Sequence, residues 1–484
     1  MLKHLLTAAL LAGAAPAPLA AQAFDPSPWI EDLEQMRQAF REKYANREWI
    51  EQERELKLDP LFDQAAAAIS KAPNEAAVRS MFDRLPAKLS DGHVRIEWPR
   101  PAAAGTAATA SPPAPELCRG LGYDARQSQP GTAIGIPGYQ PLASDAESPF
   151  AAGMITSGAT KVGVLRVGVF QPQGYPRLCR EAAAELSIPA DKPCDESCED
   201  KITTLAYRRL TEALEDRVRQ LKEAGATVLL VDISDNGGGS DWVEAAARIM
   251  SPKQLVSERR GFVRGEHWAR QWRNVATGLR EQARKASPAD KARLLAWAKE
   301  ADAAILQAQT ACATADCRQL ATAGYSTGLV GSAPSGAFAG KDWGVLVFNP
   351  AQFPYHDGVW SGPLIVLVDQ ETWSAAEEFA AVLQDNRAAV VIGARTGGAG
   401  CGYTYGGTPT KLKNSGAILK LPDCVRFRAD GSNEVSGIIP DVPVAIRADD
   451  GLRFRARLIS DRLPEAISRA QALQAQLELA GSTP

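Results

Sequence analysis

The chain has 484 residues, a formal net charge of −3 and a hydrophobic fraction of 45%. This length is sufficient for two or three domains with sizeable cores. The charge provides no electrostatic footprint for nucleic acid or for an anionic membrane, so polyanionic partners are disfavoured. No apolar run beyond the N-terminus is long enough to span a bilayer.

Residues 1–23 have a basic start, an apolar centre and the small-residue pattern Ala21-Gln22-Ala23. These features are typical of a cleavable secretory signal. Cleavage would leave Phe24 as the first residue, and no cysteine lies near the junction to carry a lipid. We therefore expect a periplasmic or secreted protein.

All 8 cysteines lie beyond the signal, and this even count favours disulfides in an oxidising compartment. The close pairs Cys194/Cys198 and Cys312/Cys317 could instead hold a metal, but no third Cys or His has a zinc-like spacing around either. We also expect a Cys401–Cys424 disulfide, because these residues flank segments that can return as a hairpin through 416–421.

The chain divides into five parts. Residues 24–98 carry helical periodicity and predict a small helical N-terminal domain that carries His93 near its end. Residues 99–160 are rich in Ala, Pro and Gly and predict a linker or irregular region without a convincing PDZ module. Residues 161–450 predict the core, with an insertion near 256–340 for which a surface embellishment is favoured over a lid. Residues 451–484 predict a helical end.

Within the core, strands and helices alternate, which indicates an α/β fold with a largely parallel sheet. Helices are expected over about 203–224, at 242–250 and after Ser374, with a charged helix in the insertion at 286–309. Strands are expected at 162–170, 226–233, 343–348, 364–368, 388–393, 416–421 and 425–429.

The corner after the run Leu364–Val368 is the most informative segment. The chain turns from a buried strand into a helix whose first residues include Ser374. At such a corner the first backbone N–H groups of the helix lack intrahelical partners, so the amide of Ala375 could hold an oxyanion beside the Ser374 hydroxyl. Ser374 could equally be a simple helix cap.

A second segment, Asp235 to Ser240, places three glycines directly after a buried strand. Glycine permits backbone conformations closed to other residues, so amides can point into a cleft. Gly237 and Gly238 are the candidate oxyanion donors, whereas a flexible turn is the alternative. Sequence motifs of zinc peptidases, nucleotide hydrolases and α/β-hydrolases are missing from the chain.

Together these segments resemble the tail-specific and tricorn-core serine peptidases of family S41. The matching stretches are VDISDNGGGS at 231–240, SAAE at 374–377, LQDN at 383–386, VVIGARTGG at 390–398 and EVSGIIPD at 434–441. The resemblance implies a crotonase-like α/β core, a serine-type peptidase acting on peptides or unfolded proteins, and no metal or organic cofactor.

The resemblance also suggests the base. Ala399 stands where one branch of the family has a catalytic Lys, whereas the segment LSDGHV, residues 89–94, matches the His-bearing element of the tricorn-like branch. Gly92 stands where the tricorn peptidase has a Ser. His93 is therefore expected to be the general base, with an apparent pKa of about 6 to 7. Glu434 is expected to be the supporting acid.

Glu377 could orient nearby groups, although a first-turn carboxylate is also favourable to the helix dipole. His267 and His356 are expected to be non-catalytic. Two alternatives stay open: a binding protein on the same fold without hydrolytic activity, and a Ser–Lys peptidase that uses Lys411 or Lys413.

Overall fold

The computed structural model describes residues 24–99, 114–143, 147–188, 194–310, 319–447 and 449–481. The predicted signal and the Cys312/Cys317 pair lie outside these ranges. Within them, no helix combines the length and the apolar character needed to cross a membrane.

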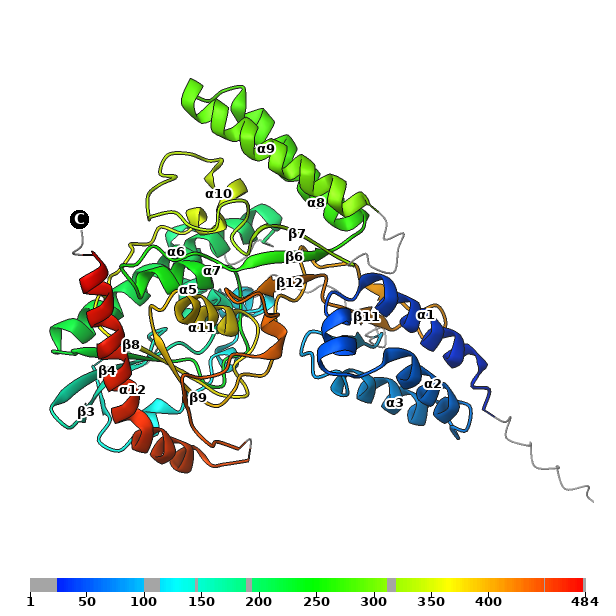
Figure 1. Cartoon of the computed structure of the whole chain (residues 1–484), viewed down its shortest axis with the longest axis horizontal. Coiled ribbons are helices and arrows are strands. Elements are labelled where there is room, and N and C mark those ends of the chain that lie inside the picture. Colours follow the sequence, from blue (N-terminus) through cyan, green and yellow to red (C-terminus); the bar gives the residue numbers. More distant parts are fainter. Residues whose placement is uncertain are drawn as a thin grey trace, which may run out of the picture.

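The N-terminal region is helical, as predicted, and forms a separate layer against the core (Figure 1). Its elements are α1 (Ser27–Lys43), a π-helical turn (Trp49–Glu53), α2 (Leu58–Ile69) and α3 (Glu75–Ala87). Trp29, Leu33, Met36 and Phe40, spaced to share one face of α1, are all buried.

A small antiparallel sheet joins this region to the core, in the order β1-β11-β10. Its strands are β1 (Arg95–Glu97), β10 (Thr410–Lys411) and β11 (Ile418–Lys420). The apolar side chains of the 412–421 hairpin, including Leu412 and Leu419, are buried in the same cluster as the N-terminal helices. The strand that directly follows His93 is thereby fixed to the core.

The main sheet has seven strands in the order β13-β9-β8-β5-β4-β3-β2. Its parallel strands are β4 (Thr160–Arg166), β5 (Val228–Asp232), β8 (Leu364–Val368), β9 (Val390–Gly393) and β13 (Val442–Pro443). The predicted mixed α/β core is thus present. Part of the region predicted to be irregular, 99–160, instead adds the antiparallel edge strands β2 (Gln140–Pro141) and β3 (Ala152–Ser157).

Both faces of this sheet are covered, which explains the unbroken apolar runs in its strands. Alternate residues of β8 enter different clusters: Leu364 and Val366 face one side, and Ile365 faces the other. The first side is packed by α5 (Pro176–Glu185), α6 (Glu196–Glu223), α7 (Trp242–Ile249) and α11 (Ala375–Asp385). The second is packed by α12 (Leu452–Gly481), in the segment predicted to be helical.

The insertion forms a second antiparallel sheet, β12-β6-β7, and a helical pair that projects from the body in Figure 1. Its elements are β6 (Arg259–Val263), α8 (Glu266–Ala283), α9 (Pro288–Gln309) and β7 (Leu320–Tyr325). Because β6 pairs with β12 (Cys424–Phe427) of the core, the insertion is more than a surface embellishment.

One predicted strand is wrong. Residues 343–348 contain the short helix α10 (Gly344–Val347), not a strand. A short apolar run has no periodicity that separates a buried strand from a buried helical turn. The remaining short elements are α4 (Ala114–Gly120) and 3-10 turns at Ala125–Gln127, Ala133–Gly135, Pro172–Gly174, Asn349–Gln352 and Glu434–Ser436.

Three disulfides occur in the described chain: Cys118–Cys179, Cys194–Cys198 and the predicted Cys401–Cys424. The third joins the loop after β9 to the start of β12.

Candidate active site

Ser374 lies at the corner between β8 and α11, as the sequence predicts. Its backbone has φ = +55°, a left-handed conformation that costs energy for a residue with a Cβ. Surrounding contacts stabilise it: Trp373 N–H donates to the carbonyl of Asn236 (2.9 Å), and Ser374 N–H donates to Glu377 Oε2 (3.0 Å). The corner directs the hydroxyl of Ser374 into a cavity.

The structure brings His93 to Ser374. The distance between His93 Nε2 and Ser374 Oγ is 3.1 Å. On the other side of the ring, His93 Nδ1 lies 2.7 Å from the carbonyl oxygen of Ala399. A carbonyl can only accept, so Nδ1 carries the proton and Nε2 has its lone pair toward the hydroxyl.

Long-range contacts hold the backbone of His93. Asp91 Oδ1 accepts from His93 N–H (3.0 Å), and its Oδ2 accepts from Tyr44 Oη (2.9 Å) and Asn46 Nδ2 (2.8 Å). The hydroxyl of Tyr403 donates to the His93 carbonyl. Burial raises the pKa of Asp91 to about 6.

The packing around position 92 explains why a glycine stands there. A Cβ at this position would lie 1.9 Å from the ring of Trp373, the residue before Ser374. A serine at 92 is therefore sterically incompatible with this packing.

The environment of His93 disfavours a charged ring. Burial lowers its pKa to about 4, and the positive charges of Arg426 and Arg95 contribute in the same direction. The pKa of about 6 to 7 expected from the sequence is corrected accordingly. His93 is neutral, and able to accept a proton, over a wide pH range.

Glu377 connects the serine corner with the loop that orients His93. Its carboxylate accepts from Gly398 N–H and Ala399 N–H, both at 2.8 Å, and from Thr396 Oγ1 at 2.6 Å, in addition to Ser374 N–H. Burial, with the nearby charge of Glu434, raises the pKa of Glu377 to about 7, and the hydrogen bonds from Thr396, Ala399 and Gly398 oppose that rise. The side chain thus fixes both partners of the His93 ring.

Glu434 is buried but does not contact His93. It binds Arg426 through two hydrogen bonds, one of them from Nη2 to Oε1 at 2.8 Å. Arg426 Nη2 in turn donates to the carbonyls of Ser374 and Gly400, each at 3.1 Å. His93 Nδ1 therefore faces the Ala399 carbonyl and not a carboxylate, and Glu434, the predicted supporting acid, reaches the site through Arg426.

The glycine loop lies beside Ser374. A Cβ on Gly238 would come within 2.8 Å of Ser374 Cβ and 3.0 Å of Ala375 N, so only glycine permits this approach. Gly238 N–H donates to Asn236 Oδ1 (2.9 Å), which engages that amide. Among the described residues, the amides of Gly237 and Ala375 have no such acceptor, so these two stay the candidate oxyanion donors.

These groups line a cavity of approximately 510 Å³, which contains His93, Ser374, Ala375 and the glycines at 237–239. Neither Lys411 nor Lys413 is among its lining residues, and Lys413 Nζ lies 3.9 Å from Glu31 on the surface. His267 bonds to Thr404 O and His356 to Glu215, so both are engaged elsewhere. In the described chain, no cluster of three metal-ligating side chains occurs.

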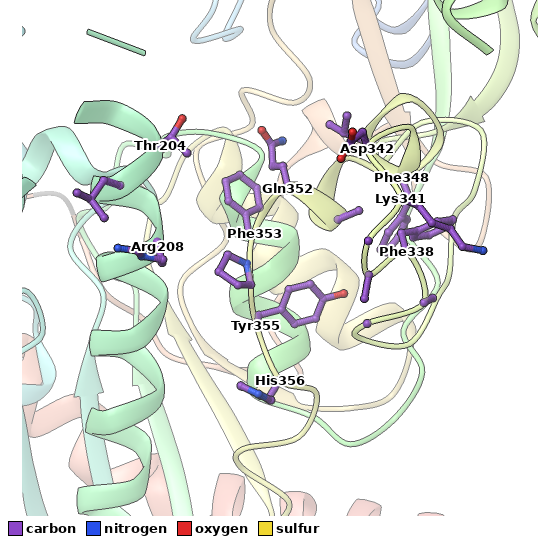
Figure 2. Close-up of a pocket in the computed structure, with 18 of the residues that line it drawn as sticks. Thr204, Arg208, Phe338, Lys341, Asp342, Phe348, Gln352, Phe353, Tyr355 and His356 are labelled. Atoms are coloured by element: carbon purple, nitrogen blue, oxygen red, sulfur yellow. The ribbon is translucent and has the colours of Figure 1, made fainter. Parts of the chain in front are cut away.

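A larger cavity of approximately 950 Å³ lies elsewhere, between α6 and the loop at 334–356 (Figure 2). It shares no lining residue with the cavity that contains Ser374 and His93. Its walls are mainly apolar, with Phe353 and Tyr355 facing Arg208 of α6. Its lining residues include neither a serine nor a cysteine.

Sequence reasoning missed two groups. The Ala399 carbonyl is a backbone atom and has no sequence signature. Arg426 had one weak signal, since it is a cation on a strand that otherwise reads as buried, and such a cation needs carboxylate partners.

A comparison with known protein families identifies the family of this chain. The sequence profile of Peptidase family S41 matches residues 201–444, just over half of the chain. The chain belongs to peptidase family S41, a family of serine-type peptidases.

Solved structures and one curated protein are also similar. The crystal structure of mature CPAF has a TM-score of 0.59 at 15% identity, covering 92% of this chain and 98% of that chain. Mature CPAF complexed with lactacystin has a TM-score of 0.58 at 16% identity, with coverages of 93% and 99%. At such identities the likeness shows the fold. An uncharacterized protein of Chlamydia muridarum (strain MoPn / Nigg) is 32% identical over 119 residues, 24% of this chain and 18% of that protein.

Proposed function

We propose that this chain is an exported serine endopeptidase in which Ser374 attacks the peptide bond and His93 is the general base. The observation that carries the proposal is the 3.1 Å contact between His93 Nε2 and Ser374 Oγ, with Nδ1 engaged by a carbonyl. A serine hydroxyl needs such a base to become nucleophilic near neutral pH. Export is supported by the N-terminal signal pattern and the disulfides.

In the proposed reaction His93 Nε2 takes the proton of Ser374 Oγ as Oγ bonds to the substrate carbonyl carbon. The amides of Ala375 and Gly237 stabilise the oxyanion. His93 then gives the proton to the leaving amine, and water hydrolyses the acyl-enzyme by the reverse sequence. Glu434 supports the site indirectly, because it holds Arg426 against the Ser374 carbonyl.

The decisive experiment compares the wild type with Ser374→Ala. A serine-directed fluorophosphonate should label Ser374 in the wild type, and an unstructured protein substrate should be degraded. Ser374→Ala should lose both activities. Its free energy of unfolding should change by no more than the loss of a helix cap, about 1 kcal/mol. A protein that binds peptides without hydrolysis would show no labelling, and turnover by Ser374→Ala would exclude this nucleophile.

A further inference from the structure

A cavity of approximately 700 Å³, different from the one in Figure 2 and called the second cavity below, adjoins the catalytic cavity. The two share five lining residues: Asp241, Glu378, Cys401, Tyr403 and Arg426. Glu378 lies on α11 one helical turn after Ser374, and Arg426 contacts the Ser374 carbonyl. The second cavity therefore begins where a bound substrate would meet the nucleophile.

The lining of this second cavity is part polar and part apolar, and the apolar part comes mainly from the insertion and from α10. Polar side chains complete the lining, among them Arg260, Gln271, Asn274 and Asn349. Trp268, Trp272 and Val275 of α8 form one wall, and Leu346 of α10 and Leu329 contribute to another. The two indoles are packed, with ring centroids 6.2 Å apart, and each is almost fully buried in the helical subdomain. Such rigid aromatic surface is suited to an apolar side chain.

The charged side chains at the boundary between the two cavities have partners within the protein. Glu378 is 3.2 Å from Arg426 Nη1, and Asp241 accepts from Asn349 Nδ2 at 2.9 Å while it faces the charge of Arg260. Arg426 also contacts Glu434 and Glu258, so the charged side chains at this boundary already have partners within the protein and are poorly available to a charged substrate side chain.

An exposed aromatic residue stands at this cavity as well. Tyr405 is 84% exposed and lines it, in a backbone conformation with φ = +46° that is unusual for a non-glycine residue. A ring held in this way offers apolar surface to an incoming chain.

We infer that this cavity is a specificity pocket that takes a bulky apolar side chain, aromatic or branched aliphatic, from the residue beside the scissile bond. The inference rests on the proposed peptidase function and assigns its substrate class. The insertion that carries α8 is then the element that sets the preference of this chain.

The test uses internally quenched peptides that differ only beside the scissile bond, with Phe, Leu, Ala, Lys or Glu on either side, and cleavage positions mapped by mass spectrometry. The full-length wild type should have a kcat/KM about tenfold or more higher for Phe and Leu than for the other three. Equal rates, or a preference for Lys or Glu, with normal fluorophosphonate labelling would overturn the pocket and leave the peptidase intact. Absence of both labelling and cleavage would overturn both proposals.

Two variants localise the preference. Val275→Trp should fill the pocket and reduce kcat/KM for the Phe and Leu peptides about tenfold, with the Ala peptide and the fluorophosphonate rate unchanged. Thr277→Trp, exposed on the same helix and outside the cavity lining, is the matched control. Tyr405→Ala, at an exposed position that folding tolerates, should weaken the preference in the same direction. An unchanged preference in both Val275→Trp and Tyr405→Ala would contradict the assignment.

Discussion

The two halves of the candidate catalytic pair are positioned in different ways. Ser374 is placed by local structure, a strand, a corner and a helix that are consecutive in the chain. His93 lies in a turn, and its backbone bonds to Asp91, which Tyr44 holds in place. Its position also depends on contacts with Tyr403 and Ala399, which come from a distant segment. A nucleophile built locally can be recognised from a pattern, whereas the geometry of this base exists only in the assembled fold.

The largest expected effect comes from removal of the base. His93→Ala should lower kcat/KM by about a thousandfold or more, because among the described residues His93 Nε2 is the basic nitrogen that is hydrogen-bonded to Ser374 Oγ. Lys411→Ala and Lys413→Ala are the controls and should be nearly silent. Steady-state kinetics on a peptide substrate would measure this, and an active His93→Ala with a dead lysine variant would restore the Ser–Lys alternative.

A smaller effect is expected from a change in Glu377, because its carboxylate binds the backbone of both Ser374 and Ala399. In Glu377→Gln an amide NH2 would face at least one of the backbone donors that the carboxylate now accepts, which costs about 1–3 kcal/mol for each buried donor left without a partner. We expect kcat to fall about tenfold or more, with less change in KM, because Ser374 and Ala399 shift together. Glu371→Gln, exposed in the same corner, is the control. Equal effects of the two variants on kcat would contradict a positioning role.

The contact between His93 and Ser374 can be tested by the addition of one methyl group beside the His93 ring. A Cβ at Gly402 would lie 2.9 Å from His93 Nε2, whereas a Cβ at Gly406 would meet nothing within 4 Å. Both glycines have positive φ, +77° and +79°, so both Ala variants carry similar backbone strain of about 1 kcal/mol. Gly402→Ala should therefore lose about tenfold in kcat/KM relative to Gly406→Ala.

The mildest perturbation is a change of pH. Burial lowers the pKa of His93 to about 4, so the ring becomes protonated, and unable to act as base, only as the pH falls through that value. The rate of fluorophosphonate labelling should fall on the acid side near pH 4. Arg95→Gln removes a positive charge that disfavours the imidazolium, so its acid limb should move to higher pH. A limb near pH 7 that disappears in Glu377→Gln would assign the titration to Glu377 instead.

Much of the core could be predicted from the sequence, because long or strongly apolar segments have clear periodicity. The run at 364–368 forms β8 with the predicted bounds, and α11 begins directly after Ser374. The short run at 343–348 was ambiguous and proved helical. The pairing of His93 with Ser374 was suggested by family resemblance, not by periodicity. The partner of His93 Nδ1 could not be predicted, since it is a backbone carbonyl, and Arg426, the partner of Glu434, had only a weak signal in the sequence.

The bond between His93 and Ser374 joins residues 281 positions apart. Because a ribosome adds about 5–20 residues per second, the segment with the base exists for tens of seconds before the serine is made. Arg426 and Cys424, which secure the corner and the adjoining loop, are synthesised later still. The order of synthesis therefore delays assembly of the site. A partly synthesised polypeptide has His93 without Ser374, and the candidate catalytic pair forms only near the end of biogenesis.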